Sequence, residues 1–187
     1  MITIRKYEEK DRDNLFKICV ATSGLPTETQ KDLDFLNLLY NDYYAVVEPQ
    51  NCFVAVNEDD ETVGYILCAE NFDRYYKTFK GLYMPQIKKL GFNFFTMAMG
   101  EISVHRLFKK KYPAHLHIDI LPEAQRQGLG TKLIDALTSH LKAKGINNVS
   151  VLTISRKSMG YKFYTKYGFR KVGAISNDRI TMTYDIK

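Results

Sequence analysis

The sequence has few cysteines and no long apolar run, and both absences narrow the kinds of protein it can be. Its three cysteines, Cys19, Cys52 and Cys68, are widely spaced and never form a Cys-x-x-Cys pair. They indicate neither a disulfide framework nor a zinc knuckle, and we expect small buried thiols. No apolar run approaches the roughly 20 residues of a membrane span. The charged N-terminus lacks a signal-peptide core, so we expect a cytoplasmic protein with no membrane partner.

Composition and charge describe an ordinary globular chain with a basic surplus. Of 187 residues, 45% are hydrophobic and 26% are charged, which is typical of a single domain over 1–187 with a real core. The net charge of +6 favours anionic partners without naming one. The densest basic run is Lys109–Lys111, and we expect a solvated loop there. The alternative is a nucleic-acid surface with steeply salt-dependent binding, but we expect no nucleic-acid partner, and a monomer or homodimer.

Apolar periodicity and turn residues predict an alternating order of strands and helices. Helices are expected from Asp11, over about 31–44, 128–143 and 156–167, the last ended by Gly168 as a left-handed cap. Strands are expected over 2–6, 52–56, 62–68, 115–121, 148–154, 169–174 and 179–186. The last of these alternates cleanly, which predicts an antiparallel strand buried on one face. The fold class is therefore α/β, with a mixed central sheet of about seven strands and helices on both faces.

Residues 71–113 form a long, aromatic and basic segment before the expected central strand. Its turn signals are Gly81, Pro85 and Gly91. A structureless loop of this length is unusual in a compact domain, so we expect a helical insert. Its aromatic residues are candidates for an acceptor cleft or for the insert's own core, and we expect core. They are Tyr75, Tyr76, Phe79, Tyr83, Phe92, Phe94 and Phe95.

A glycine-rich turn follows the strand 115–121 and leads directly into an amphipathic helix. Its sequence is Gln125-Arg126-Gln127-Gly128-Leu129-Gly130-Thr131. The glycines allow the backbone to approach a ligand, and the first helical turn offers free N–H groups at the positive end of the helix dipole. Such a turn suits a pyrophosphate. It is neither a Walker loop, because Thr131-Lys132 follows Gly130, nor a dinucleotide fingerprint, because Leu133 occupies the third small-residue position.

The helix predicted over 156–167 has two distinct faces. Met159 and Phe163 are expected on its core side. A second stripe recurs at i, i+3, i+4 and i+7; it consists of Lys157, Gly160, Tyr161 and Tyr164. A glycine inside a helix costs about 1 kcal/mol relative to alanine, so Gly160 indicates close packing or a ligand.

Together these motifs resemble the GNAT superfamily of acetyl-CoA-dependent N-acetyltransferases. The resemblance covers Gln125-x-x-Gly128-x-Gly130 after Pro122, then Phe163-Tyr164-x-x-x-Gly168-Phe169, with the hairpin Phe53–Cys68 before them. It spans most of the chain outside residues 71–113. The run His115–Pro122 is also similar, more weakly, to the acetyltransferase-like domain of O-GlcNAcase and its bacterial relatives. The resemblance implies the GNAT fold, with acetyl-CoA as cosubstrate and an amine of a small molecule or protein as acceptor.

The resemblance also implies roles for individual residues. Backbone groups near Ile120 and Leu121 would pair with the pantetheine arm beside a splayed sheet. Tyr164 matches the tyrosine that protonates the departing thiolate, and acetyl would pass directly to the amine without an acyl-enzyme. The pyrophosphate would be held by Gln125, Arg126, Gln127, Gly128, Leu129, Gly130 and Thr131. Lys157 stands where the family often has Asn, and Lys157 or Arg156 would lie near the 3′-phosphate. Tyr161 is a further candidate coenzyme contact.

The amine must lose a proton before or during attack, so a base is needed. Asp119 on the central strand is our candidate, acting directly or through water, and Glu101 is a second. An Asp119 that is merely ion-paired or hydrogen-bonded is the structural alternative. His115 and His117 share the face of Asp119, a pattern that can bind metal, but no fourth ligand is nearby and we expect no metal.

A second class of function stays open on the same fold. A non-catalytic module that binds acyl-CoA or a protein partner fits the same motifs. The lysine at position 157 and the unassigned base leave this alternative standing. Release of coenzyme A in the presence of an amine would separate the two classes.

Overall fold

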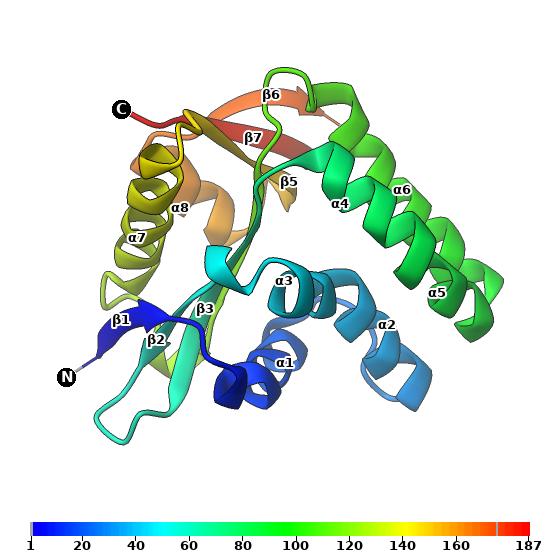
Figure 1. The fold of residues 1–187 in the computed structure, drawn as a ribbon, viewed down its shortest axis with the longest axis horizontal. Helices are drawn as coiled ribbons and strands as arrows, with labels where there is room; N and C mark the ends of the chain where they lie inside the picture. The colour runs from blue at the N-terminus through cyan, green and yellow to red at the C-terminus, as the bar shows by residue number, and fades with distance from the viewer. Residues whose placement is uncertain (1, 175) are drawn as a thin grey trace.

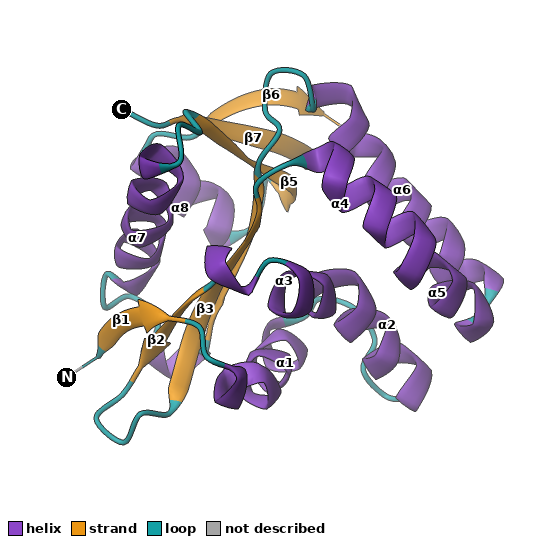
Figure 2. Ribbon diagram, in the orientation of Figure 1, coloured by secondary structure: helices purple, strands orange, loops and turns teal. Residues whose placement is uncertain are grey.

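The computed structural model describes residues 2–174 and 176–187, and its strands form a single sheet (Figures 1 and 2). The strand order is β1-β2-β3-β4-β5-β7-β6. Only β4 and β5 are parallel among the described pairs. The strands are β1 Thr3–Lys6, β2 Phe53–Val56, β3 Thr62–Ala69, β4 His115–Ile120, β5 Asn148–Ser155, β6 Arg170–Ala174 and β7 Arg179–Asp185. The prediction of a mixed sheet of about seven strands is confirmed.

Helices cover both faces of the sheet, as predicted (Figure 2). Helices α7 and α8 lie on one face, and α1 to α6 lie on the other. The bounds are α1 Arg12–Thr22, α2 Gln30–Tyr40, α3 Asp42–Val47, α4 Phe72–Thr78, α5 Met84–Leu90, α6 Phe92–Phe108, α7 Leu129–Ala143 and α8 Met159–Tyr167. A π-helical segment, Phe79–Tyr83, joins α4 to α5. No helix of the described chain is long and apolar enough to cross a bilayer.

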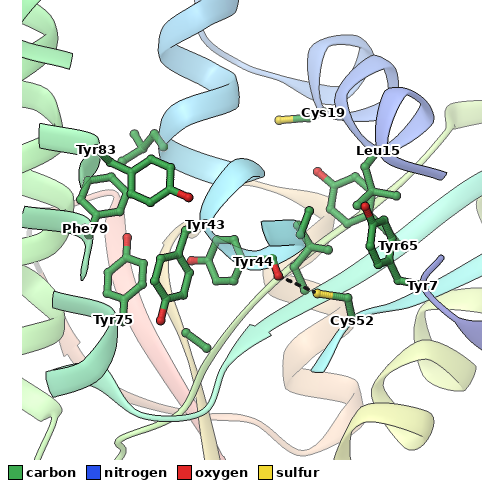
Figure 3. Packing of buried hydrophobic residues seen from close by; sticks show 14 of the residues in the cluster. Tyr7, Leu15, Cys19, Tyr43, Tyr44, Cys52, Tyr65, Tyr75, Phe79 and Tyr83 are labelled. Carbon is green, nitrogen blue, oxygen red and sulfur yellow. Dashed lines mark hydrogen bonds between the residues drawn. The ribbon is translucent and has the colours of Figure 1, made fainter. Parts of the chain in front are cut away.

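The alternation of side chains along the strands divides the interior into two cores. On one face, Ile66 of β3 and Leu116 of β4 pack against α7. All five apolar residues of the α7 stripe are buried there, as predicted: Leu129, Leu133, Ile134, Leu137 and Leu141. On the other face, Tyr65 and Leu67 of β3 face an aromatic core. Figure 3 shows Tyr43 and Tyr44 of α3 between Tyr65 and the insert.

The segment 71–113 forms the predicted helical insert, composed of α4, the π-helical segment, α5 and α6 (Figure 1). Its aromatic residues mainly form core, as predicted: Tyr75, Phe79 and Tyr83 are buried, and Tyr76, Phe94 and Phe95 pack against them. Phe92 differs because it is 76% exposed at the start of α6. The insert is joined to the body through Arg74, whose guanidinium contacts the buried carboxylate of Glu48 at 2.9 Å.

The sheet opens between its two parallel strands. Ser150 N donates to Ala114 O at 3.0 Å, and His115 and Ser150 form the one described register pair of β4 with β5. Beyond it the strands diverge. Leu121 N donates to Val63 O at 2.9 Å, so by alternation the odd-numbered residues of β4 bond to β3. The backbone groups of Ile118 and Ile120 therefore face the opening.

Two predicted helices differ from those observed. The stretch 31–44 is split at Asn41, whose backbone angles (φ −120°, ψ −56°) leave the helical region. The helix predicted from 156 begins at Met159, because Ser158 Oγ caps it by accepting from Tyr161 N at 3.1 Å. Met159 is therefore the first residue of the helix, and it is 63% exposed. Placing Met159 in the core was therefore wrong, and Tyr164 is buried instead.

The last strand is antiparallel to both neighbours, as predicted, but it is buried on both faces at its centre. Ile180 and Met182 face the α7 side, and Thr181 and Thr183 are equally buried on the other. β7 lies between β5 and β6, and Phe108 of the insert packs closely on β6 at Gly173. The insert thus covers a surface that alternation alone predicts to face solvent.

The three cysteines are buried free thiols, as predicted. Burial raises the pKa of Cys19 and of Cys52 to about 12. Both thiols are therefore protonated near neutral pH and poor nucleophiles.

Candidate active site

The glycine-rich turn links β4 to the N-terminus of α7. Gln125 to Gly128 are exposed, and Arg126 and Gly128 adopt left-handed backbone angles (φ 62° and 76°). Gly128 is the N-cap of α7, so the free N–H groups of the first helical turn follow it directly. Gln125 Nε2 donates to Ile120 O at 2.9 Å and braces the turn against β4. The turn presents backbone donors and a helix dipole to solvent, which is the arrangement that binds phosphate groups.

The seven residues of this turn contribute in different ways. The side chain of Leu129 is buried in the core, so Leu129 offers only its backbone N–H. Gly130 is required by packing, because a Cβ there would lie 2.9 Å from Phe163 Cζ. Gly160 is likewise required, because its Cβ would lie 2.9 Å from Ile154 Cδ1. Both glycines bring α8 close to the turn and to the end of β5.

Tyr164 of α8 is buried beside the opening in the sheet. It is 5% exposed, and its ring centroid lies 5.0 Å from that of Phe169. Burial, and then the charge of Asp119, raise the pKa of Tyr164. The phenol is therefore a proton carrier that remains protonated at neutral pH, and it lies within electrostatic reach of Asp119.

The structure does not place Lys157 on the helical stripe of Tyr164. Lys157 lies in the turn before α8, where its N–H donates to Ser155 Oγ at 3.2 Å, and its side chain is exposed. Tyr161 is in the helix and partly buried against the α7 core. The stripe consequently begins at Gly160, and Lys157 lies on the loop at its N-terminal end.

Asp119 lies at the centre of a hydrogen-bonded group on β3 and β4. The Tyr65 hydroxyl donates to Asp119 Oδ2 at 2.6 Å, and His117 Nε2 lies 3.4 Å from the same oxygen. The His117 ring stacks on Tyr40, with centroids 5.1 Å apart. Asp119 is thus hydrogen-bonded, as the alternative to a catalytic base predicted. Its side chain also borders a cavity, so it remains a candidate base. A hydrogen-bonded carboxylate beside an imidazole can accept a proton from an amine.

His115 shares the face of His117 and Asp119, as predicted, but it lies deeper in the protein. The Tyr44 hydroxyl and His115 Nε2 are hydrogen-bonded at 3.0 Å, and the His105 ring of α6 meets His115 at 4.2 Å between centroids. Burial, and then His117, lower the pKa of His115 to about 3. Within the described residues, no group of three His, Cys, Asp or Glu side chains is placed to hold a metal ion.

A cavity of about 800 Å³ lies beside these groups, within the size range of small-molecule sites. Its walls come from the loop after α1, from α2, from α6 of the insert, from β4 and β5, and from the start of β7. Asp119 and His117 line it from β4, Tyr40 lines it from α2, and Glu101 lines it from α6. The predicted second base, Glu101, pairs with Arg179 of β7 at 2.7 Å.

Several residues in and around the cavity were not predicted from the sequence. Tyr40, Asp178 and Arg179 line it, and Tyr65 hydrogen-bonds to Asp119. The sheet register that pairs Tyr65 with Asp119 is set by tertiary structure and leaves no local motif. The cap at Ser158 did leave a signal, because serine before a helix is a typical N-cap.

These features together define a class of protein. A mixed sheet that opens beside a phosphate-type turn, next to a polar cavity, is suited to bind a phosphorylated coenzyme and a second molecule. The chain belongs to the acetyltransferase (GNAT) family, whose model matches residues 15–169. The predicted family is therefore confirmed.

Solved structures share the whole fold at low sequence identity. The protein named SsHAT has a TM-score of 0.85 and 22% identity, and the match covers 100% of this chain and 98% of that one. A polyamine N-acetyltransferase of Drosophila melanogaster that forms N-acetylagmatine has a TM-score of 0.67 and 13% identity, over 99% and 100% of the chains. A PaiA N-acetyltransferase from Thermoplasma acidophilum, in complex with coenzyme A, has a TM-score of 0.63 and 17% identity, over 99% of each chain.

Proposed function

We propose that this chain transfers acetyl from acetyl-CoA to a primary amine by direct attack in a ternary complex. Membership of the GNAT family supports acetyl transfer, and similar folds include a coenzyme A complex and a polyamine acetyltransferase. One observation carries the proposal: the sheet opens between β4 and β5, and Asp119 of β4 borders a cavity that residues of β5 also line. A candidate base therefore lies on the strand that borders the opening.

The opening between β4 and β5 is the proposed coenzyme site. The pantetheine arm pairs with the backbone of Ile118 and Ile120, which faces the opening. Leu121 was expected to share this role, but its N–H donates to Val63 O and its carbonyl accepts from Ala124 N. The Ile120 carbonyl accepts from Gln125 Nε2, so we assign the pairing to the N–H of Ile120 and to the backbone of Ile118. The pyrophosphate lies on the turn Gln125–Thr131, and Lys157 and Tyr161 lie at the N-terminal end of α8 for further contacts.

The proposed reaction uses one base and one acid. Asp119, directly or through water, accepts a proton from the ammonium of the acceptor. The neutral nitrogen attacks the thioester carbonyl; the N–C bond forms and the C–S bond breaks. The Tyr164 phenol donates its proton to the departing thiolate. The attacking nitrogen loses its second proton to solvent, and solvent returns one proton to Tyr164, so the products are the acetamide, coenzyme A and the one proton accepted by Asp119. The buried thiols take no part, which fits transfer without an acyl-enzyme.

Coenzyme A release with a panel of primary amines tests this proposal. Tyr164→Phe should lower kcat by about a hundredfold or more, the contribution of a general acid, while the dissociation constant of acetyl-CoA changes little. Tyr167→Phe is the matched control on the same helix, because its hydroxyl donates to Asp135 at 2.6 Å on the far side. It should retain kcat within twofold.

The same assay separates the enzyme from a non-catalytic binding module. Such a module gains thermal stability with coenzyme A but releases none with any amine. Full activity of Tyr164→Phe across pH would refute the assignment of the acid. Full activity of Asp119→Asn would likewise refute the assignment of the base.

A further inference from the structure

The cavity beside Asp119 is acidic although the chain as a whole is basic. Three carboxylates are among the described residues that line it: Glu101, Asp119 and Asp178. Among the same residues, the only lysine or arginine is Arg179. His105 also lines it, but burial lowers the pKa of His105 well below its usual value, and so does His115 to a smaller extent. That imidazole is neutral. An excess of negative charge in a partly enclosed cavity of a chain with net charge +6 favours a cationic occupant.

The carboxylates occupy two separate positions. Asp119 lies on β4, beside the opening proposed for the thioester. Glu101 of α6 lies on the wall formed by the insert, where it pairs with Arg179 at 2.7 Å, and Asp178 directly precedes Arg179. Tyr40 also lines the cavity, and its ring stacks on His117 next to Asp119.

Two buried polar atoms at the insert end lack partners. Asp178 Oδ1 is buried and accepts no hydrogen bond from any described residue. One helical turn after Glu101, the His105 side chain is 6% exposed and its Nδ1 is also without a described partner. A buried carboxylate oxygen without a donor is costly. A protonated amine in the cavity supplies the donors that Asp178 lacks.

The rest of the wall suits a methylene chain. Tyr40, Tyr44 and Tyr75 line the cavity, and burial raises the pKa of each. Their rings are neutral, and they present apolar surface to an aliphatic chain and π faces to a cation.

We infer that the acceptor is an aliphatic amine carrying a second cationic group, bound at both of its ends. Its reacting nitrogen lies at Asp119, and its second cation lies between Glu101 and Asp178. Glu101 and Asp178 are thus specificity-determining residues that do not take part in the chemical step. This inference rests on the proposed function, because it names the acceptor class of the same site.

The test compares 1,4-diaminobutane and longer diamines with monoamines of equal chain length, by coenzyme A release. The wild type should prefer the best diamine by about tenfold or more in kcat/KM, as expected for the loss of a charge-assisted contact. Glu101→Gln and Asp178→Asn should each raise KM for the diamine severalfold and so lower the ratio of diamine to monoamine kcat/KM toward one. Added salt should raise KM for the diamine more than for the monoamine.

Asp59→Asn is the matched control, because Asp59 lies exposed in the β2–β3 turn, and it should behave as wild type. Glu101→Gln also breaks the ion pair with Arg179, so the separate Asp178→Asn variant tests the site with that pair intact. Thermal unfolding verifies that each variant is folded. Equal kcat/KM for diamines and monoamines would overturn the inference and leave the proposed function intact. A variant that slows both classes of amine equally would also overturn it.

If no amine is acetylated, the proposed function fails but the inference is still tested. Isothermal titration of diamine and monoamine into the coenzyme-saturated protein then measures binding alone. Tighter diamine binding that is lost in Asp178→Asn supports the inference. Equal binding, or no binding of either amine, refutes it.

Discussion

Gly130 lies where the glycine-rich turn packs against Phe163 of α8. A Cβ at this position would lie 2.9 Å from Phe163 Cζ, so Gly130→Ala must displace the ring. We expect a loss of about 1–3 kcal/mol in the free energy of unfolding, as for other overpacked sites, and weaker acetyl-CoA binding. Denaturant unfolding measures the first effect and calorimetric titration the second.

Gly100 provides the matched control for Gly130→Ala. It lies inside α6, and a Cβ there meets nothing within 4 Å. Gly100→Ala should therefore increase the free energy of unfolding by about 1 kcal/mol, the difference in helix propensity. Equal effects of the two substitutions would contradict the packing role assigned to Gly130.

The buried histidines predict how stability depends on pH. Burial lowers the pKa of His115 from 6.5 to about 3, and it lowers that of His105 as well. The unfolded chain therefore binds more protons than the folded one below pH 6.5, so the free energy of unfolding should fall as pH drops from 6.5 toward 3. Each histidine contributes up to about 1.4 kcal/mol per pH unit to the slope of the free energy of unfolding against pH. Unfolding of the wild type and of His105→Gln/His115→Gln between pH 7 and 4.5 measures this slope, and an unchanged slope in the double variant would contradict it.

Residue-level prediction from sequence succeeded where one residue determines the local backbone. Gly168 ends α8 with φ 118° as the predicted left-handed cap, and Gly128 has a positive φ at the turn. Prediction from sequence failed where contacts between distant elements determine the position of a residue. Met159 is exposed at the first position of α8, whereas Phe163 one turn later packs against the core. Asp178 and Arg179 join the cavity only because α6 lies against β7.

At the scale of elements, one buried carboxylate contributes to the attachment of the insert to the body, beside the aromatic core and the contact of Phe108 with β6. Glu48 accepts hydrogen bonds from Tyr43, Asn51, Arg74 and the backbone of Glu70. Glu48→Gln replaces an acceptor by a donor amid these groups and should lower the free energy of unfolding by about 2–3 kcal/mol. Thermal or denaturant unfolding measures this loss.

The exposed pair between Lys109 and Asp73, which also involves the insert, is the control for Glu48→Gln. Lys109→Met should change stability by less than about 1 kcal/mol, as for other surface ion pairs. Comparable losses in the two variants would show that the attachment of the insert does not depend on Glu48.

Most elements were predictable because each has its own local signal. The α7 stripe, the acidic hairpin turn and the helical character of 71–113 follow from periodicity and turn residues. The break at Asn41 and the burial of both faces of β7 were not predictable. Both depend on neighbouring elements: β7 is covered because the insert packs on β6 through Phe108.

At the scale of the whole molecule, the basic surplus is concentrated in the insert. Residues 71–113 contain nine lysines and arginines and two acidic residues, a local charge of +7 against +6 for the chain. The remainder of the chain is therefore close to neutral. The acidic cavity lies where the basic insert meets this body, which is consistent with an insert that determines the acceptor.

The central claim is that acetyl-CoA binds in the opening between β4 and β5, on the turn Gln125–Thr131. Hydrogen–deuterium exchange with and without coenzyme A tests it most directly. We predict slower exchange at the amides of Ile118, Ile120 and Gln127–Thr131, with little change in α4 and α5. Unchanged exchange at saturating coenzyme A, or protection confined to the insert, would contradict the account.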